Sequence, residues 1–513
     1  MYHTETIDID RKHPMLQYAD NYTAYANNMF NTANFYIRNL MTGLKKDADK
    51  RTTNESEVIA IVKESIPSIN KSLKEKYDQK VGRIKADKSL TDEEKDKKIK
   101  RVKYSEFSMP NAEKWFAGEA LLEAVFKRTD NADYRACHVH VAQNAVGDCC
   151  EAWSGYFALL KTPGLSGRPN IPGYKKPGGR TTAVFSNQGC KIKNGFLIFP
   201  GDKADKTNNV SLDVRKLPHA SKDKLIEVHI VPYFGSYQVQ IVTDDGISID
   251  DILPKEDGMF DTAGNPKGIM ILDPGLDNFA AIADNKGNTP IVIKGGALKS
   301  RNQWFNKRMA LLRSKLMEGH NPETYRPQTT KKMSQLSRKR EAFIDDTFYK
   351  YAHFIFRTMK SRQLEYLIVG HNKGQKNEIF LGNKTNQAFV QLPFARFNEI
   401  LAVVARRYGI RVIIQEESYT SKACFAARDF IPVYVEEEAD AAVFSGKRIH
   451  RGLYKQNDGK TMNADVNGSC NIGRKYNERV FPKDLDTGYL YKTVKAMTYK
   501  DILMESHKAK SII

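Results

Sequence analysis

The spacing of hydrophobic residues changes twice along the chain, and these changes constrain the fold more than any other feature. From about residue 21 to residue 162 apolar residues recur at helical intervals. After a Pro- and Gly-rich break that begins at Thr162, they alternate as they do in strands. From Gly268 onward, strand patterns alternate with helix patterns, which indicates an α/β layer domain. We therefore expect a multidomain α/β protein with a helical lobe, a small β domain and an α/β domain, as the length of 513 residues allows.

A lysine-rich stretch at about 71–104 interrupts the helical lobe. Thr91 followed by Glu94 is the pattern of a capping box, so a second helix is expected to begin there. The stretch is predicted to be a protruding helical hairpin. A solvated charged face and contact with RNA are equally good explanations of its lysines.

The charge balance points to a polyanionic partner. Lys and Arg number 81 against 61 Asp and Glu, which gives a net charge of +20. Nucleic acid is favoured over a membrane surface, because no basic amphipathic anchor with exposed aromatics is present. No apolar run is long enough to span a bilayer, and the first residues lack the apolar core of a signal peptide. A cytoplasmic protein of bacterial type, associated with the nucleoid when bound to DNA, is expected.

The cysteines indicate neither a disulfide framework nor a zinc knuckle, because none of them forms a CxxC pair. Reduced and mostly buried thiols are expected. The six cysteines are Cys137, Cys149, Cys150, Cys190, Cys424 and Cys470.

Two aspartates follow patterns that suit metal ligands. Asp273 comes directly after the apolar run GIMIL and before Pro-Gly, so a charged acid ends what is expected to be a buried strand. Burying such a charge is costly unless it binds something, although an aspartate that opens a turn is the ordinary alternative. Asp465 lies in NADVNGSCNIGRK just before an expected helix, where an N-cap aspartate is the alternative. Phosphodiester cleavage with two metal ions needs carboxylates of this kind from separate parts of a fold.

A pair of glutamates offers a third acid. Glu416 and Glu417 end the expected strand RVIIQEE. Neighbouring residues on a strand point to opposite faces, so only one of the two is expected to face a shared site. The strand pattern leaves open which one.

Four segments in order resemble the motifs of TnpB-type proteins, which are transposon-encoded RNA-guided nucleases related to type V CRISPR effectors and Fanzor proteins. The segments are GIMILDPGLDNFAAI, LIVGHNKGQK, EESYTSKAC and NADVNGSCNI. Further upstream, VHVAQNAVGDCCEAWSGYFALLK, GRPNIPGYKK and NQGCKIKNGFLIFPG resemble the passage from the helical lobe to the wedge domain of that family. The resemblance runs from about Ala136 to Arg474, and it is specific as an ordered set although each motif alone is weak.

The resemblance implies a helical recognition lobe, a β-barrel wedge domain and an RNase H-like RuvC nuclease domain. It places a degenerate zinc-ribbon insertion inside the nuclease domain, because the CxxC pairs of the family ribbon are missing and Cys424 alone stands there. No structural zinc is therefore expected. The implied ranges are 1–20 for an N-terminal wedge strand, 21–162 for the lobe, 163–262 for the wedge, 263–513 for the nuclease domain and about 422–455 for the insertion.

The resemblance also implies the catalytic residues. Asp273 matches the first RuvC acid and Asp465 the last. The family glutamate that usually ends the strand YLIV is absent, since Gly370 and His371 stand there. Some branches place this acid beside the Tyr-Thr-Ser motif, where Glu416 and Glu417 lie, and Glu417 is the favoured of the two.

These three acids are expected to hold two Mg²⁺ ions, of which one activates water and the other stabilises the leaving 3′ oxygen. His371 is expected to line the groove or to pack in the core. The pair Asn372 and Lys373 is expected to contact a phosphate.

The function implied is that of an RNA-guided DNA endonuclease that cuts guide-matched DNA next to a short flanking motif. Its partners would be a guide RNA and target double-stranded DNA, with no membrane involved and the oligomeric state left open. The alternative is a nuclease-inactive RNA-guided DNA-binding repressor, which the missing glutamate at Gly370 motivates. A transposase or guide-free resolvase is a third hypothesis, and RNA that co-purifies with the protein would argue against it.

Overall fold

The computed structural model divides into two compact units, Met1–Gly246 and Ile247–Ile513, and each is described by itself. The finer domain boundaries expected at residues 162 and 262 stay predictions. The structure describes residues 1–162, 167–201, 210–321, 324–326, 328–371, 392–433, 442–450 and 452–510.

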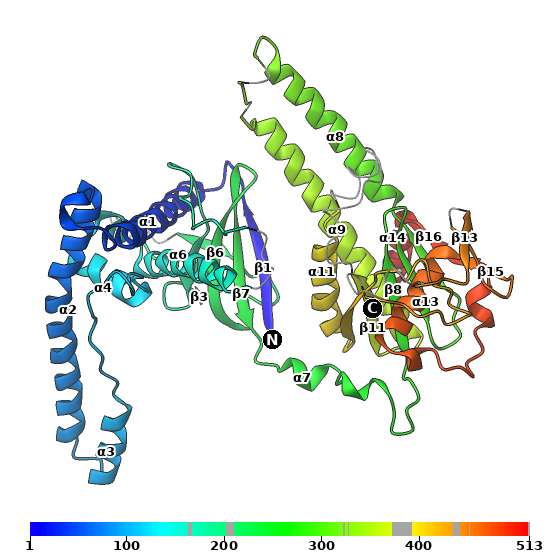
Figure 1. Ribbon diagram of the computed structural model, residues 1–513, viewed down its shortest axis with the longest axis horizontal. Coiled ribbons are helices and arrows are strands. Elements are labelled where there is room, and N and C mark those ends of the chain that lie inside the picture. The colour runs from blue at the N-terminus through cyan, green and yellow to red at the C-terminus, as the bar shows by residue number, and fades with distance from the viewer. Residues whose placement is uncertain are drawn as a thin grey trace. The chain divides into compact units, whose positions relative to one another are not determined.

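The N-terminal unit begins with a strand, continues with helices and ends with strands (Figure 1). Its elements are β1 (Tyr2–Ile9), α1 (Leu16–Gly43), η1 (Ala48–Lys50), α2 (Thr53–Ala86), α3 (Asp92–Arg101), α4 (Glu119–Arg128), α5 (Ala132–Ala136), α6 (Val139–Leu160), β2 (Ala183–Ser186), β3 (Lys191–Lys193), β4 (Phe196–Ile198), β5 (Ser211–Asp213), β6 (Lys224–Tyr233) and β7 (Ser236–Asp244).

Helices α1 and α6 form the centre of the helical part of this unit, and a buried polar contact joins them. The Trp153 side chain of α6 is fully buried, and its indole nitrogen donates to Asn34 Oδ1 of α1 at 2.9 Å. The Asn34 amide nitrogen in turn donates to the carbonyl oxygens of Pro172 (3.2 Å) and Gly173 (3.1 Å). Asn34 therefore ties two helices to the segment that leads into the β strands.

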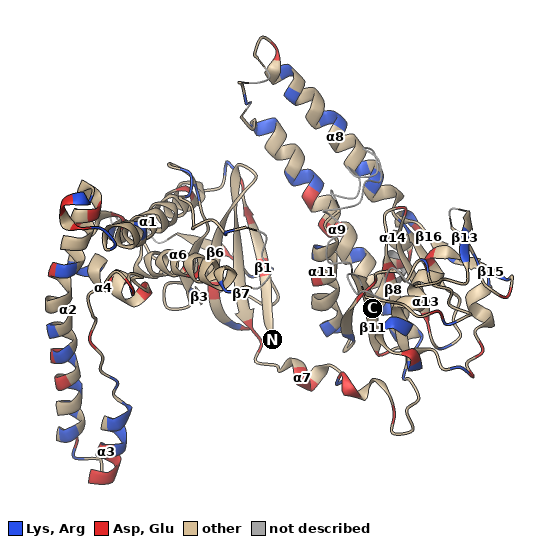
Figure 2. Ribbon diagram, viewed as in Figure 1, with Lys and Arg blue, Asp and Glu red and all other residues tan. Residues whose placement is uncertain are grey.

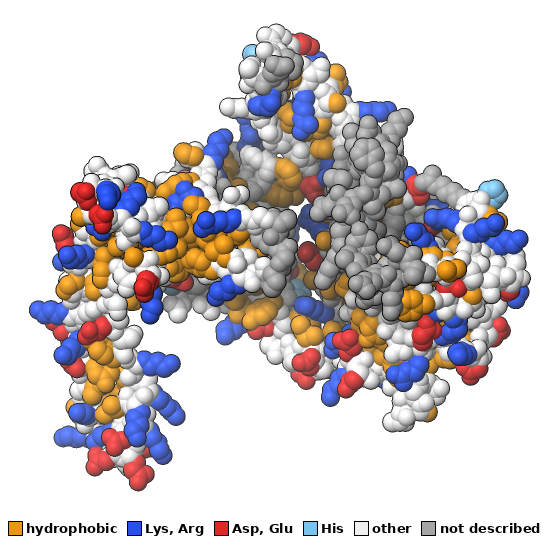
Figure 3. All heavy atoms as spheres, in the orientation of Figure 1, with side chains coloured by type: hydrophobic (Ala, Val, Ile, Leu, Met, Phe, Trp, Pro, Cys, Tyr) orange, Lys and Arg blue, Asp and Glu red, His pale blue; other side chains and the backbone are white. Residues whose placement is uncertain are grey.

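The lysine-rich stretch forms a helical arm built from the end of α2 and from α3. The predicted capping box is confirmed, because Thr91 Oγ1 accepts from the Glu94 backbone and the Glu94 carboxylate accepts from the Thr91 backbone (2.9 Å). None of the residues of α3 is buried. Lysine and arginine residues recur along this arm in Figure 2, and Figure 3 shows their side chains on its surface.

The strands of the N-terminal unit form two open antiparallel sheets. One has the order β1-β7-β6-β2 and the other the order β3-β4-β5. Strand β1 pairs with β7 over its whole length, from Tyr2 opposite Asp244 to Ile9 opposite Tyr237. The predicted closed barrel was wrong for the described residues. Closure needs every strand to pair on both sides, whereas β1 and β2 are edges and β3 to β5 span only three residues each.

The C-terminal unit alternates strands and helices. Its elements are α7 (Ile249–Ile252), η2 (Asp257–Met259), β8 (Ile269–Pro274), β9 (Asn278–Asp284), β10 (Ile291–Lys294), α8 (Gly296–Met317), α9 (Lys331–Ser361), β11 (Tyr366–His371), α11 (Phe394–Arg407), β12 (Arg411–Glu416), β13 (Lys447–His450), β14 (Leu453–Lys455), β15 (Thr461–Asn463), α13 (Ala464–Tyr476), η3 (Glu478–Val480), η4 (Gly488–Tyr491), β16 (Lys495–Met497) and α14 (Tyr499–Lys510).

A six-stranded sheet of order β12-β11-β8-β9-β10-β16 is the centre of this unit. Strands β8, β11 and β12 are parallel, and β9 is antiparallel to β8. Both faces of β8 are covered, which explains its continuous apolar run. Met270 packs into the core formed with α9 and α11, and Ile271 packs into the opposite core with α13 (Figure 1). The carboxyl ends of the three parallel strands therefore meet at one edge of the sheet.

The expectation of a multidomain protein with mixed helix and sheet is confirmed. Helices α8 and α9 form a second basic hairpin, with lysine and arginine along both helices in Figure 2. Among the described residues, no helix combines the length and the apolar character that crossing a membrane requires.

Replacing Asn34 with alanine tests the contact that joins α1 and α6. The change leaves the buried Trp153 indole nitrogen without its acceptor and opens a small cavity, so we expect a loss on the order of 3 kcal/mol in the free energy of unfolding. Urea denaturation of the full chain measures it. Asn39→Ala is the matched control on the same helix, because that amide donates only to the Phe35 carbonyl oxygen within α1. If Asn34→Ala loses no more stability than this control, the Asn34 contact does not stabilise the packing of α1 against α6.

Candidate functional site

The carboxylate of Asp273 lies at the carboxyl end of β8, where the apolar run of the strand ends. Burial raises the pKa of this group well above its ordinary value, and the negative charges of Glu417 and Asp465 raise it further. The positive charge of Arg448 acts in the opposite direction. Glu417 and Asp465 are thus close enough to Asp273 to raise its pKa, although the three residues come from separate parts of the unit.

Asp465 is the second residue of α13 and is not its N-cap. The cap is Asn463, whose side-chain oxygen accepts from the backbone of Asp465 (3.0 Å) and Val466 (3.1 Å). The Asp465 carboxylate is thereby left for other partners. It accepts from Asn278 Nδ2 at 2.6 Å and forms an ion pair with Arg448 at 2.7 Å. The ordinary capping role that the sequence allowed for Asp465 is therefore excluded.

A glycine lets α13 approach the end of β8. A Cβ atom at Gly468 would collide with Asp273 Oδ2, so the aspartate carboxylate lies against bare helix backbone. Gly468 is one turn after Asp465, and both residues thus face the end of β8. A side chain at this position would push Asp273 away from Asp465.

A second glycine makes room for Glu417. A Cβ atom at Gly370, near the end of β11, would collide with Glu417 Oε2 and with Ile472 of α13. The Glu417 carboxylate therefore lies over the strand position where the resembled family carries its usual glutamate. A side chain at Gly370 would occupy the space of the Glu417 carboxylate, so the absence of a glutamate at position 370 makes room for Glu417.

Glu416 is held elsewhere. Its carboxylate forms an ion pair with Lys475 of α13 and accepts from the backbone nitrogen of Ser418 at 2.5 Å. Burial alone would raise the pKa of Glu416, but these hydrogen bonds hold it below its ordinary value. Of the four predicted acids, the structure brings together Asp273, Glu417 and Asp465, and it does not bring Glu416 to them.

The three grouped acids suit a divalent cation. Like charges that approach in a partly desolvated site repel one another, unless a proton or a cation compensates them. Burial raises the pKa of Asp273 most, and this repulsion raises it further. All three side chains offer carboxylate oxygen atoms, which are the ligands that Mg²⁺ prefers. In the chemistry of their ligand atoms, the residues present therefore suit the predicted magnesium centre.

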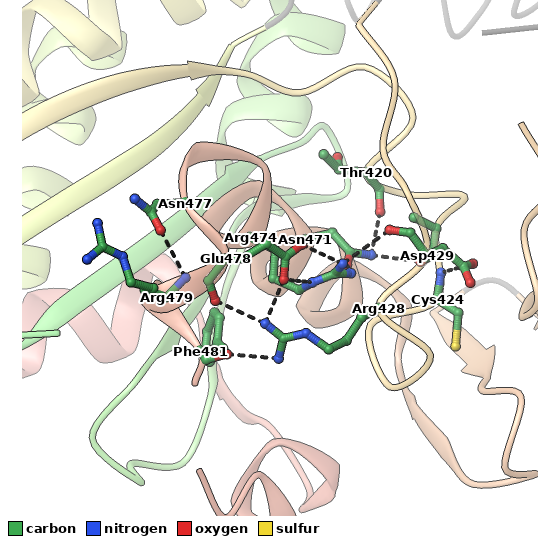
Figure 4. Close-up of polar contacts among 11 residues, drawn as sticks. Thr420, Cys424, Arg428, Asp429, Asn471, Arg474, Asn477, Glu478, Arg479 and Phe481 are labelled. Carbon is green, nitrogen blue, oxygen red and sulfur yellow. Dashed lines mark hydrogen bonds and ion pairs between the residues drawn. The ribbon is translucent and has the colours of Figure 1, made fainter. Parts of the chain in front are cut away.

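Asn471 and Arg474 attach α13 to the neighbouring loops. Asn471 donates to the carbonyl oxygens of Thr420 (3.0 Å) and Ala423 (2.7 Å). Arg474 donates to Asn471 Oδ1 and to Glu478, as Figure 4 shows. These contacts hold α13 in place, so the asparagines and the arginine of its motif position Asp465 from behind.

The remaining predicted residues lie near this centre or outside the described residues. His371 ends β11 opposite Glu416. Asn372 and Lys373 fall outside the described residues. Cys424 is buried, and its thiol donates to Gln456 Oε1 at 2.9 Å.

Sequence reasoning missed four residues that organise the site. The preference of asparagine for N-caps was a usable signal for Asn463, because it stands two residues before Asp465. The other three stood in no motif whose chemistry pointed to the acids. They are Asn278, Arg448 and Lys475.

Two sequence families match the C-terminal unit. Residues 262–376 match the OrfB_IS605 family, described as a probable transposase. Residues 394–472 match the Cas12f1-like TNB domain. No curated protein matches the chain.

Solved structures of guided effectors are similar over much of the chain, at low identity. A Cas12f1-sgRNA-target DNA complex is 15% identical, with 92% of this chain and 98% of that chain covered and a TM-score of 0.28. C2c1 of Alicyclobacillus acidoterrestris in complex with single-guide RNA is 9% identical, with 88% and 70% covered and a TM-score of 0.32.

The two family matches fall on the segments that carry the motif resemblance, in the same order. The first contains Asp273 and Gly370, and the second contains Glu417 and Asp465. The predicted resemblance to the TnpB-type family, which is related to the type V CRISPR effectors, is confirmed by these two matches.

Proposed function

We propose that the chain is an RNA-guided DNA endonuclease that hydrolyses guide-matched DNA next to a short flanking motif. The reaction would take place in a RuvC-type, RNase H-like domain formed by the C-terminal unit. The observation that carries the proposal is the convergence of Asp273, Glu417 and Asp465 at one edge of a mixed sheet, with the pKa of Asp273 raised by burial and by the other two charges. The two family matches on the C-terminal unit support the same reaction.

Asp273, Glu417 and Asp465 would hold two Mg²⁺ ions. When bound, these ions supply a nucleophilic water at neutral pH and neutralise charge on the leaving oxygen. The chain itself orients the acids. Asn278 fixes one oxygen of Asp465, and Gly468 keeps the helix backbone close to Asp273.

Arg448 lies beside the proposed catalytic acids. Its guanidinium, on β13, contacts the Asp465 carboxylate at 2.7 Å. A guanidinium beside an acidic centre can donate two hydrogen bonds to a phosphate, which gives it both charge and geometric fit. We therefore assign Arg448 to the DNA strand that enters the site.

The proposed guide RNA and target DNA match the charge of the protein. The net charge is +20, and basic side chains follow the α2–α3 arm and the α8–α9 hairpin (Figure 2). Phosphate neutralisation by such residues dominates affinity for nucleic acid, while base pairing with the guide would read the target sequence.

The alternative of a nuclease-inactive DNA-binding repressor rested on the missing glutamate at Gly370. The place of the Glu417 carboxylate over Gly370 weighs against it, because the acid is supplied from the neighbouring strand end. The grouped acids weigh against it too, since a protein that only binds DNA gains nothing from their mutual repulsion.

A matched pair of glutamate variants tests the proposed catalytic set. Glu417→Gln should lower the rate of guide-directed, Mg²⁺-dependent DNA cleavage by about 100-fold or more, as Asp273→Ala should, because each removes a charged ligand. Glu416→Gln should keep the rate within about threefold, because that side chain is bonded to Lys475 and Ser418. Retained RNA binding shows that each variant is folded. The opposite ranking of the two glutamates would refute the assignment.

Gly370→Ala tests the fit between the glycine and the relocated acid. The added methyl group collides with Glu417 Oε2 and Ile472, so cleavage should fall by about 10-fold or more while guide RNA still binds. Gly296→Ala is the control in the same unit, because a Cβ atom there meets nothing within 4 Å. Equal activity of the two variants would show that Glu417 does not need this space.

Asp273→Asn should stabilise the protein in the presence of a chelator. Because the carboxyl pKa is raised in the folded state, ionisation destabilises the fold at any pH above the ordinary pKa of aspartate, and fully above the raised pKa; the penalty is absent below the ordinary value. The free energy of unfolding of the variant near neutral pH should therefore exceed that of the wild type. Thermal melting measures it, and saturating Mg²⁺ should stabilise only the wild type. A less stable variant would contradict this account.

A further inference from the structure

Two histidines and an aspartate come together in the N-terminal unit, at the end of the four-stranded sheet where β1 begins. His3 lies on β1, while His219 and Asp223 lie in the turn between β5 and β6. One candidate ligand atom from each of the three side chains lies within 4.8 Å of the others. The three side chains are partly exposed, by 14%, 28% and 16% respectively, so an ion from solvent can reach them.

Backbone contacts hold this cluster together independently of its histidine rings. His3 and Glu5 lie on the same face of β1, because strand residues two apart share a face. Glu5 Oε2 accepts from the backbone nitrogens of His219 (3.1 Å) and Ala220 (2.6 Å). The Asp223 backbone nitrogen donates to the His219 carbonyl oxygen at 2.8 Å, which closes the turn and brings these two side chains together.

The hydrogen bonds of the rings resemble those of metal-bound histidines. His3 Nε2 bonds to Asp245 Oδ2 at 2.9 Å, and such a carboxylate fixes the tautomer and orientation of a ligating imidazole. His219 Nδ1 lies 2.8 Å from Asp223 Oδ2. Two ligand atoms on one tetrahedral ion stand about 3.3 Å apart, given bonds of about 2.0–2.1 Å, so the pair needs only a small opening to hold an ion between them. The two imidazoles stack with centroids 3.6 Å apart, so one ring must turn for both to direct a nitrogen at the same ion.

We propose that His3, His219 and Asp223 form a binding site for one divalent transition-metal ion of the zinc class. A solvent molecule would complete the four ligands, and Asp245 would orient His3. Two imidazoles and one carboxylate favour zinc, cobalt or nickel over magnesium, which prefers oxygen ligands alone. The site is thus chemically distinct from the all-carboxylate centre of the C-terminal unit.

The proposed ion would fasten an edge strand. Within its sheet, β1 pairs only with β7. An ion shared by His3 and the turn at residues 219–223 would add a further attachment of β1 to this turn, beside the Glu5 hydrogen bonds. Metal binding would therefore appear as stabilisation of the N-terminal unit, because an ion that binds only the folded state shifts the unfolding equilibrium.

The experiment titrates untagged, chelator-treated full-length protein with Co²⁺ in the presence of excess Mg²⁺, which occupies hard oxygen sites. We expect one equivalent of Co²⁺ to give visible absorption bands of a tetrahedral site and to be displaced by Zn²⁺. At 100 times its dissociation constant, Zn²⁺ should raise the melting temperature by on the order of 5 °C. A folded wild type that binds no such equivalent would overturn the proposal, and this result needs no variant.

Variants identify the ligands. His219→Asn should abolish the cobalt bands, and Asp245→Asn should weaken binding by about 10- to 100-fold, as the loss of an orienting carboxylate does. His229→Asn is the matched control, because His229 pairs with Glu227 in the same unit at 3.0 Å and belongs to no such cluster among the described residues. Asp273→Ala should leave the cobalt site unchanged. Bands that persist in His219→Asn, or that vanish in Asp273→Ala, would place the ion elsewhere and refute the proposal.

Discussion

The packing of α13 against β8 and β9 holds together charges that repel one another. Val466, Cys470 and Ile472 of this helix are buried against Ile269 and Ile271 of β8. On the other side of the helix axis, hydrogen bonds from Asn471 and Arg474 anchor it to the neighbouring loops. This apolar and polar framework offsets the cost of placing Asp465 and Glu417 beside a desolvated Asp273. The acidic centre is therefore a strained feature of a stable fold, as functional sites often are.

Two glycines give the centre its shape, and each acts through a close approach. Gly468 allows the helix backbone to touch the Asp273 carboxylate, and Gly370 leaves the space that the Glu417 carboxylate fills. The second case accounts for the departure from the usual family pattern. Strands β11 and β12 are parallel neighbours, and their ends meet at the same edge of the sheet. An acid can thus move from the end of one strand to the end of the next and still reach the same place, provided that the vacated position has no side chain.

The sequence predicted those features that depend on local pattern. The apolar runs before Asp273 and before Glu416 predicted strands that end in acids, and the Thr91–Glu94 pair predicted a capping box, which is present. Alternation along β12 could not tell which glutamate faces the site. That choice depends on Lys475 and Gly370, which are distant in sequence.

For features that depend on long-range pairing, the sequence-based prediction was either wrong or absent. The strand patterns did not distinguish a closed barrel from the two open sheets, because closure depends on strand length and on which edges pair. Arg448 reaches Asp465 from a short strand with no motif of its own. The cluster of His3 and His219 arises only because the β1–β7 register and the Glu5 contacts bring together residues more than two hundred positions apart.

The central claim is that the grouped acids cut DNA under the direction of an RNA. The most direct measurement isolates the protein with the RNA that co-purifies with it, sequences that RNA, and incubates the complex and Mg²⁺ with plasmids that carry the matching target beside a randomised flanking library. We expect RNA of defined sequence, and cleavage of only those plasmids that share one short flanking motif. Protein that carries no RNA, or a complex that cuts no member of the library, would contradict it.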